Sequence, residues 1–362
     1  MQFSSFFRFN TLSALLFAAV FSISFTGSTP VLAASEPAAA GEEAEFNPGE
    51  VILHHIADAH DWHLFDLTNE DGTLHPVSIP LPIILLTNGN LDVFMSSAFD
   101  HGHAEVVKGE RTYKLDHGHI VETSGASVLD FSITKNAASM MLSIVILLLI
   151  FTAAGRSSTK NKGGAPTGIA RFMEPLVLFV RDEIAIPNIG EKHYKRFMPY
   201  LLTVFFFIWI NNLLGLVPAG ANFTGNIAVT LTLAAFTMII TNVSGTKTYW
   251  SHIFTPHVPK WLYPIMIPVE LIGVISKPFA LTIRLFANIT AGHIIILSLV
   301  SLIFIFKTVL IAPVSVAFVL FMSVLELLVA ALQAYVFTLL SALFIGLALE
   351  EPHHEHETKH SH

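Results

Sequence analysis

The sequence has no cysteine and little charge, and each absence excludes a class of chemistry. Without cysteine there can be no disulfide, no thiolate metal site and no cysteine nucleophile. Only 13% of the 362 residues are charged, whereas soluble domains carry about 25%. The sequence also lacks a basic tract for nucleic acid and a G-x-x-x-x-G-K-[ST] motif for nucleotide phosphates. We therefore expect neither nucleic-acid binding nor a P-loop nucleotide site in this chain.

Hydrophobic residues are abundant instead: they make up 53% of the chain, and the mean hydropathy is +0.63. Five apolar stretches lie at about 137–154, 197–217, 225–243, 263–306 and 308–349. A span needs about 20 residues, and a 40-residue helix of about 60 Å is twice as long as the hydrocarbon core, so the last two must be strongly tilted, broken or extended out of the bilayer. The sequence predicts an all-α polytopic membrane protein with about five transmembrane helical segments, the last two long and strongly tilted.

Residues 1–33 have the pattern of a secretory signal peptide. Arg8 supplies the positive charge, residues 11–25 supply the apolar run, and Val31-Leu32-Ala33 fits a small-residue cleavage site. The alternative is an uncleaved first transmembrane helix, for which this apolar run is short. Cleavage would place the mature N-terminus in the periplasm of a bacterium.

Residues 34–133 are polar and acidic. The stretch from 35 to 133 has 17 Asp or Glu against three Lys or Arg, and nine His. Patches such as VSIPLPIILL (77–86) could form short strands or hairpins. The His residues suggest metal binding but follow no repeated ligand spacing. We expect a solvated, periplasmic domain, and a buffering of local protons by its histidines is one hypothesis for its role.

Charge predicts the orientation of the transmembrane domain, residues 134–349. The loop 154–196 has eight Lys or Arg and four acids, so it is expected in the cytoplasm of the inner membrane. This agrees with a periplasmic N-terminus and puts the polar, His-rich tail, 350–362, in the cytoplasm. The tail contains a formal H-E-x-x-H match at 356–360, but it has no apolar periodicity, so we expect no catalytic zinc site there.

Few polar residues interrupt the two longest apolar stretches: Arg284, Asn288 and His293 in one, Glu326 and Gln333 in the other. The stretches are antiparallel if a tight turn joins them near 306–313. Arg284 and His293 are then about 13 Å apart along their helix, and Gln333 and Glu326 about 10 Å. If Gln333 lies level with Arg284, Glu326 lies near His293. The alternative is a structural Arg–Glu pair that holds the two helices together.

The level of Arg284 and Gln333 and the level of His293 and Glu326 suit different chemistry. A His/Glu pair can accept and pass a proton, because histidine changes charge near neutral pH. Arg284 keeps its charge, so it cannot relay protons, but it can hold a carboxylate ionised or block proton leakage. This chain offers few intramembrane acids near Arg284. The carboxylate it would meet is therefore expected in another subunit.

Several stretches together resemble subunit a of F-type ATP synthases, over about residues 130–350 but not over 35–133. They are RLFANITAGH (284–293), SKP (276–278), LQAYVFTLLSALFIGLAL (332–349), FVRDEI (179–184), WINNLLGLVP (209–218) and TGNIAVTLTLA (224–234). The resemblance implies a non-catalytic stator subunit with two offset proton half-channels, without cofactor or bound metal. The implied partners are a rotating c-subunit ring with membrane-buried carboxylates, the b-subunit peripheral stalk, the remaining synthase subunits, the lipid bilayer and protons.

The resemblance also implies roles for single residues. Arg284 matches the family's essential arginine, which deprotonates the ring carboxylate and prevents a short circuit between the half-channels. Gln333 matches its partner glutamine, Asn288 a polar position one turn beyond it, and Asn212 an asparagine of the outer half-channel. Glu270, near the inner end of the same long stretch, is a candidate for lining the cytoplasmic half-channel.

Some family members have an acid at the position of His293 and a histidine at that of Glu326. An exchange of the two identities preserves one acid–histidine pair, which supports their proximity in space. Lys277 is expected to pack or snorkel rather than to conduct. Three alternatives stay open: a sodium-translocating version of the same subunit, an ion-coupled secondary transporter, for which no internal symmetry is seen, and a purely structural membrane anchor.

Overall fold

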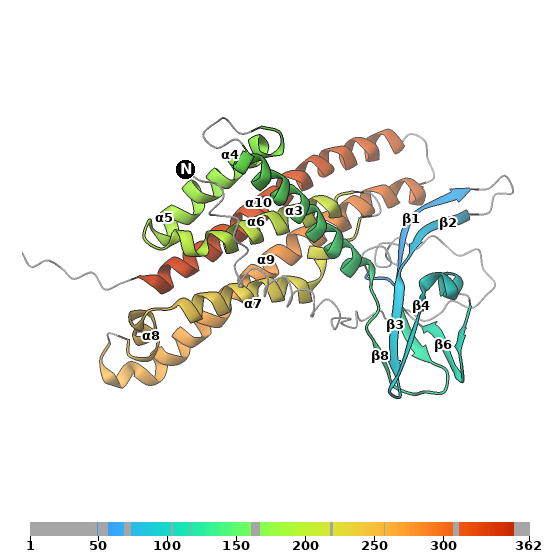
Figure 1. Cartoon of the computed structure of the whole chain (residues 1–362), viewed down its shortest axis with the longest axis horizontal. Coiled ribbons are helices and arrows are strands. Elements are labelled where there is room, and N and C mark those ends of the chain that lie inside the picture. The colour runs from blue at the N-terminus through green and yellow to red at the C-terminus, as the bar shows by residue number, and fades with distance from the viewer. Residues whose placement is uncertain are drawn as a thin grey trace, which may run out of the picture.

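The computed structural model combines a strand-rich N-terminal part with a bundle of long helices (Figure 1). It describes residues 49, 57–68, 74–102, 104–116, 118–160, 167–217, 220–256, 258–306 and 311–350. The predicted signal peptide at 1–33 and the H-E-x-x-H match at 356–360 lie outside these residues.

The N-terminal part contains three small antiparallel sheets, with strand orders β1-β2, β4-β3-β8 and β5-β6-β7. The strands are β1 Asp61–Thr68, β2 Leu74–Pro80, β3 Pro82–Thr87, β4 Asn90–Met95, β5 Val106–Lys108, β6 Arg111–Asp116, β7 His119–Glu122 and β8 Val128–Asp130. A short 3-10 helix, η2, spans Ser96–Gly102. The prediction of an all-α chain is therefore wrong for this part and correct only for the helical part that follows.

Alternating burial explains why these segments form strands. In β3, Ile83 and Leu85 are fully buried while Ile84 between them is not, which is the two-residue period of a sheet with one face on a core. Asn88 and Gly89 then turn the chain with positive φ angles of 50° and 81°. Asn-Gly is the preferred pair for a two-residue hairpin turn of this kind, so β3 and β4 pair directly.

The Asp58 carboxylate and the Ala59 backbone carbonyl fasten the strand-rich part to the first long helix, α3, which spans Lys135–Lys160. The Asp58 carboxylate accepts a hydrogen bond of 3.1 Å from the backbone N–H of Asn136, in the first turn of α3. A carboxylate at a helix N-terminus is stabilising, because it satisfies a free N–H and faces the positive end of the helix dipole. His60 Nε2 lies 2.8 Å from Asp130 Oδ2, at the end of β8.

The helical part follows α3 through residue 349. Its elements are α4 Ile169–Phe179, the π-helical turn η3 Val180–Ala185, α5 Ile186–Ile189, α6 Tyr194–Gly215, η4 Phe223–Gly225, α7 Ile227–Ser244, α8 Lys247–Phe254, η5 Lys260–Leu262, α9 Tyr263–Phe306 and α10 Ala312–Leu349. Five helices are long and apolar enough to cross a membrane: Lys135–Ser157, Tyr194–Gly215, Ile227–Ser244, Lys260–Ile303 and Ala312–Leu349. They confirm the five predicted spans.

The five spans differ in how much protein surrounds them. In α6, 67% of the most apolar window is buried, whereas the corresponding values are 11% for α9 and 17% for α10. Helix α10 packs against both α9 and α6, and α7 packs against α9. On one side of the long pair, α6 therefore supports α10 and α7 supports α9, and the other side of that pair presents apolar side chains outward.

The long helices α9 and α10 run antiparallel and side by side (Figure 1). Two contacts fix their register: His293 with Glu326, and Lys277, whose Nζ lies 5.4 Å from the ring centroid of Phe344. In this register Gln333, seven residues beyond Glu326, lies level with residue 286, about 3 Å along the axis from Arg284. The two predicted levels of polar residues are therefore present.

Candidate functional site

One of the two levels is a three-membered contact around His293. Its Nδ1 lies 2.8 Å from Glu326 Oε1 of α10, and its Nε2 lies 3.1 Å from the backbone carbonyl oxygen of Gly215, at the end of α6. The side chain of His293 is 15% exposed and that of Glu326 only 4%. The contact thus joins α6, α9 and α10 at one buried point.

The carbonyl contact fixes how protons are arranged on the pair. A carbonyl oxygen only accepts hydrogen bonds, so Nε2 of His293 must carry a hydrogen that it donates to Gly215. The short contact between Nδ1 and Glu326 then needs one more proton. Either the carboxylic acid donates it to a neutral imidazole, or an imidazolium donates it to the carboxylate. The pair therefore holds one proton that can lie on either partner.

A glycine makes room for Glu326. A Cβ atom built at Gly292 would lie 2.9 Å from Glu326 Oε1 and 3.1 Å from its Cδ. These distances are shorter than ordinary van der Waals contacts. Any larger residue at position 292 would push the carboxyl group away from His293, so Gly292 is a residue of this site that the sequence interpretation missed.

Asn212 braces the same region from α6. Its Nδ2 donates a hydrogen bond of 3.2 Å to the backbone carbonyl of Ala330, and its Oδ1 accepts one of 2.7 Å from the hydroxyl of Thr224. Asn212 is 3% exposed. Because Gly215 lies less than one turn further along α6, these bonds hold the carbonyl group that His293 contacts. Thr224 begins the TGNIAVTLTLA stretch, but no spacing in the sequence marks it as the partner of Asn212.

Arg284 is located differently. Arg284 and Asn288 lie one turn apart on α9 and are both exposed, whereas Leu285 and Ile289 beside them are buried in the core. Among the residues that the structure describes, Arg284 forms no salt bridge. Gln333 is only 4% exposed, and within the described ranges no hydrogen bond joins it to Arg284. The structure therefore brings the two to one level without linking them.

Glu270 lies near the start of α9, away from the residues above. Its Oε1 is 3.9 Å from Nδ1 of His252 on α8, and its side chain is 30% exposed. Burial raises the pKa of Tyr249, also on α8, and the negative charge of Glu270 raises that pKa further. The structure thus places Glu270 in a small polar group with α8, separate from His293 and Glu326.

No metal centre accompanies these residues. In the described part of the chain, no group of three or more His, Asp and Glu side chains is placed to hold a metal ion. The polar atoms of His293 and Asn212 are instead bonded to other side chains of the site or to backbone carbonyls. The arrangement can accept, hold and release a proton at the His293–Glu326 pair, and it can present the fixed charge of Arg284 to a neighbour.

Comparison with known families adds independent information. The family model described as ATP synthase A chain matches residues 137–346, which contain every site residue discussed above. A second family model, described only as a domain of unknown function, matches residues 51–140. The boundary between the two falls at the start of α3.

Curated relatives agree with the first of these matches. The chain is 53% identical over 238 residues to ATP synthase subunit a of Chloroherpeton thalassium, which covers 64% of this chain and 71% of the relative. It is 47% identical over 254 residues to ATP synthase subunit a of Myxococcus xanthus, with coverage of 68% and 82%.

A third relative also matches much of the N-terminal part. ATP synthase subunit a 2 of Chlorobaculum tepidum is 43% identical over 351 residues, which cover 94% of this chain and 85% of the relative. The expectation that residues 35–133 fall outside the resemblance is therefore too narrow.

Proposed function

Because this chain belongs to the ATP synthase A chain family, we propose that it is the stator subunit that carries protons past the rotor of an ATP synthase in a bacterial membrane. As such it contributes no catalytic nucleotide site. It couples the flow of protons across the membrane to rotation and thus to ATP synthesis. The transporter alternative has no support in the relatives found.

One observation carries the assignment of the rotor-facing side: Arg284 is an exposed, unpaired charge on a membrane helix. A charged side chain at the bilayer centre costs at least about 2.5–3.5 kcal/mol, and such residues normally face protein or water and have partners. Arg284 has none among the described residues. The missing partner is a carboxylate of another chain, and the c-subunit ring supplies it.

The exposed face of α9 and α10 suits this partner. The two helices are about 66 Å and 57 Å long at 1.5 Å per residue, against a hydrocarbon core of about 30 Å. They lie strongly tilted in the bilayer and follow the curved wall of the ring. Asn288 and Gln333 flank Arg284 in this contact. The remaining partners are the b-subunit peripheral stalk and the other synthase subunits.

The His293–Glu326 pair is the proton relay of the outer half-channel, with Asn212 beside it. Protons enter from the periplasm, pass this pair, and protonate the ring carboxylate. After rotation, Arg284 releases them into the inner half-channel, which Glu270 lines.

Residues 34–133 form the periplasmic domain, residues 134–349 the transmembrane domain and residues 350–362 the cytoplasmic tail. The basic loop 154–196 supports this orientation.

Replacement of Arg284 tests the proposal. We expect Arg284→Ala to abolish ATP-driven acidification of inverted membrane vesicles, with immunoblots showing equal assembly. Arg171→Ala is the matched control, since Arg171 is an exposed arginine outside the five spans, and it should pump like the unmodified protein. Unchanged pumping by Arg284→Ala would contradict the proposal.

A further inference from the structure

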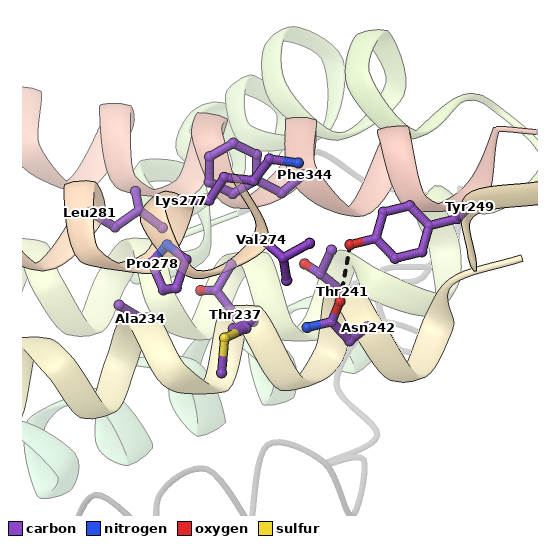
Figure 2. A pocket seen from close by; sticks show the side chains of 11 residues that line it. Ala234, Thr237, Thr241, Asn242, Tyr249, Val274, Lys277, Pro278, Leu281 and Phe344 are labelled. Carbon is purple, nitrogen blue, oxygen red and sulfur yellow. Dashed lines mark hydrogen bonds between the residues drawn. The ribbon is translucent and has the colours of Figure 1, made fainter. Parts of the chain in front are cut away.

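A cleft unrelated to the proton pair lies between α7, α9 and α10, near α8. The cleft spans about 260 Å³ of empty space, part of which is open to the surroundings. Eleven residues line it: Ala234, Thr237, Met238, Thr241, Asn242, Tyr249, Val274, Lys277, Pro278, Leu281 and Phe344. Figure 2 shows their side chains converging from the three long helices and from α8. None of these eleven residues is among those assigned to the proton path above.

Thr241 places an unsatisfied hydroxyl in the wall of this cleft. The residue is 5% exposed, and its Oγ1 finds no hydrogen-bond partner in the part of the chain that the structure describes. Its side chain projects from α7 toward Val274 of α9 (Figure 2). Buried hydroxyl groups in proteins almost always have a partner. A bound molecule with a hydrogen-bonding group would supply one here.

Asn242 offers further donors. The Tyr249 hydroxyl donates a hydrogen bond of 3.0 Å to Asn242 Oδ1 (Figure 2). Because the pKa of Tyr249 is raised by burial and by Glu270, the phenol keeps its proton and continues to donate. The amide oxygen of Asn242 is thereby occupied, and its two N–H groups are left to bind another acceptor.

Lys277 adds a positive charge from α9, on the other side of the cleft from Thr241 and Asn242 of α7 (Figure 2). Its Nζ lies 5.4 Å from the ring centroid of Phe344, and it forms no salt bridge with any residue in the described ranges. The acid in this neighbourhood is Glu270, two helical turns earlier on α9, which lies beside His252 instead. The lining has no carboxylate of its own, so the cleft does not suit a cation.

The geometry points to a binding site for a phosphate oxyanion, held by the Lys277 ammonium, the Asn242 amide and the Thr241 hydroxyl. Donors from α7 and one positive charge from α9 line the same cleft, and phosphate oxygens accept both charged and neutral hydrogen bonds. The other lining residues are mostly apolar, and exposed apolar side chains of α7 and α9, such as Val243 and Ile275, lie close by in the sequence. A phospholipid headgroup with its chains on that surface, or free phosphate, would fit this chemistry.

Binding by the purified full chain in an uncharged detergent tests the site. The probes are phosphatidylglycerol, diacylglycerol with the same acyl chains, and inorganic phosphate, measured by thermal shift and by native mass spectrometry. We expect phosphatidylglycerol to stabilise the protein and diacylglycerol to have no effect. Saturable stabilisation by inorganic phosphate alone would assign the site to the free anion; stabilisation by the lipid alone would assign it to a headgroup.

Three variants decide whether this cleft is responsible. Lys277→Met should weaken binding at least tenfold, and Lys277→Arg should retain it. Lys260→Met is the matched control, because Lys260 is an exposed lysine of η5 outside the cleft, and it should change binding less than twofold.

Thr241→Val separates binding from folding. It removes only the unpartnered hydroxyl, so the ligand-free protein should melt no lower than the unmodified one, while binding weakens several-fold. Equal binding by Lys277→Met and Lys260→Met, or equal binding of phosphatidylglycerol and diacylglycerol, would overturn the proposal.

Discussion

Two histidine–carboxylate pairs in this chain have the same contact distance of 2.8 Å, yet they lie in opposite surroundings. His60 and Asp130 join the segment before β1 to the end of β8 within the strand-rich part, where the side chain of Asp130 is 30% exposed. His293 and Glu326 lie between membrane helices, where the side chain of Glu326 is 4% exposed. Distance alone therefore does not distinguish a structural pair from a proton relay.

The other hydrogen bonds of each carboxylate make the difference. Burial by itself raises the pKa of Asp130, but the hydrogen bond and charge of His60 and the hydrogen bonds from Ser132 outweigh it and lower that pKa. The backbone N–H of Ser132 lies 2.8 Å from Asp130 Oδ1. Several donors thus hold Asp130 ionised. Glu326 has His293 as its single side-chain partner among the described residues, so no second side-chain donor stabilises its ionised form.

The largest difference in proton pumping is expected when the acid of each pair is replaced in turn by its amide. Glu326→Gln keeps the size of the side chain but cannot exchange a proton, so ATP-driven proton pumping should fall at least tenfold. Asp130→Asn should retain more than half of the pumping. Acidification of inverted vesicles measures both.

Exchange of the two membrane residues sharpens this test. The double variant with His293→Glu and Glu326→His keeps one acid and one histidine in contact, so it should pump better than either single variant. A double variant as inactive as the single ones would mean that the pair needs its present order, and a fully active Glu326→Gln would mean that it is no relay.

A smaller effect is expected from crowding Glu326 without removing it. Gly292→Ala places a Cβ within 2.9 Å of Glu326 Oε1, so the carboxyl group must shift from His293, and pumping should fall several-fold. Gly273→Ala is the control on the same helix, because nothing lies within 4 Å of a Cβ there. Equal activity of the two variants would show that the spacing of the pair does not matter.

The smallest effect concerns the stability of the strand-rich part. Since the pKa of Asp130 is lower in the folded protein than its ordinary value of about 3.9, its stabilisation is fully present above that value. It is lost as the pH falls through the lowered pKa. A hydrogen bond to a charged group contributes about 1.5–3 kcal/mol. The melting temperature followed by the β-strand signal in circular dichroism should fall between pH 6 and pH 3. The fall should be smaller in Asp130→Asn. An equal fall in melting temperature in Asp130→Asn and in the unmodified protein would contradict the role of Asp130.

The membrane part could be predicted from sequence because the bilayer imposes a simple requirement. A span needs about 20 apolar residues, and the predicted boundaries differ from the observed spans by no more than four residues. The pair of His293 and Glu326 could be predicted on the assumption that Gln333 lies level with Arg284, since the constant rise per residue of two antiparallel helices then places Glu326 near His293. That step used no contact information.

Other features could not be predicted in the same way. The carbonyl of Gly215 lies 78 residues from His293 in the chain and has no side chain to mark it. Gly292 makes room by an absence of atoms, which composition does not reveal. The strands were recognised only around 77–86, although the Asn88-Gly89 turn was a usable signal. Most of the strands are short, and their alternation is weaker than the apolar runs of the spans.

One measurement tests most directly whether the His293–Glu326 pair holds a transferable proton while His60–Asp130 does not. Difference infrared spectroscopy of the assembled synthase between acidic and neutral pH would compare the unmodified protein with Glu326→Gln and Asp130→Asn, so that the ring carboxylates contribute equally. We predict a protonated-carboxyl band that titrates in the unmodified protein and in Asp130→Asn and is missing from Glu326→Gln. A titrating band that survives Glu326→Gln unchanged, or one that disappears only in Asp130→Asn, would contradict this account.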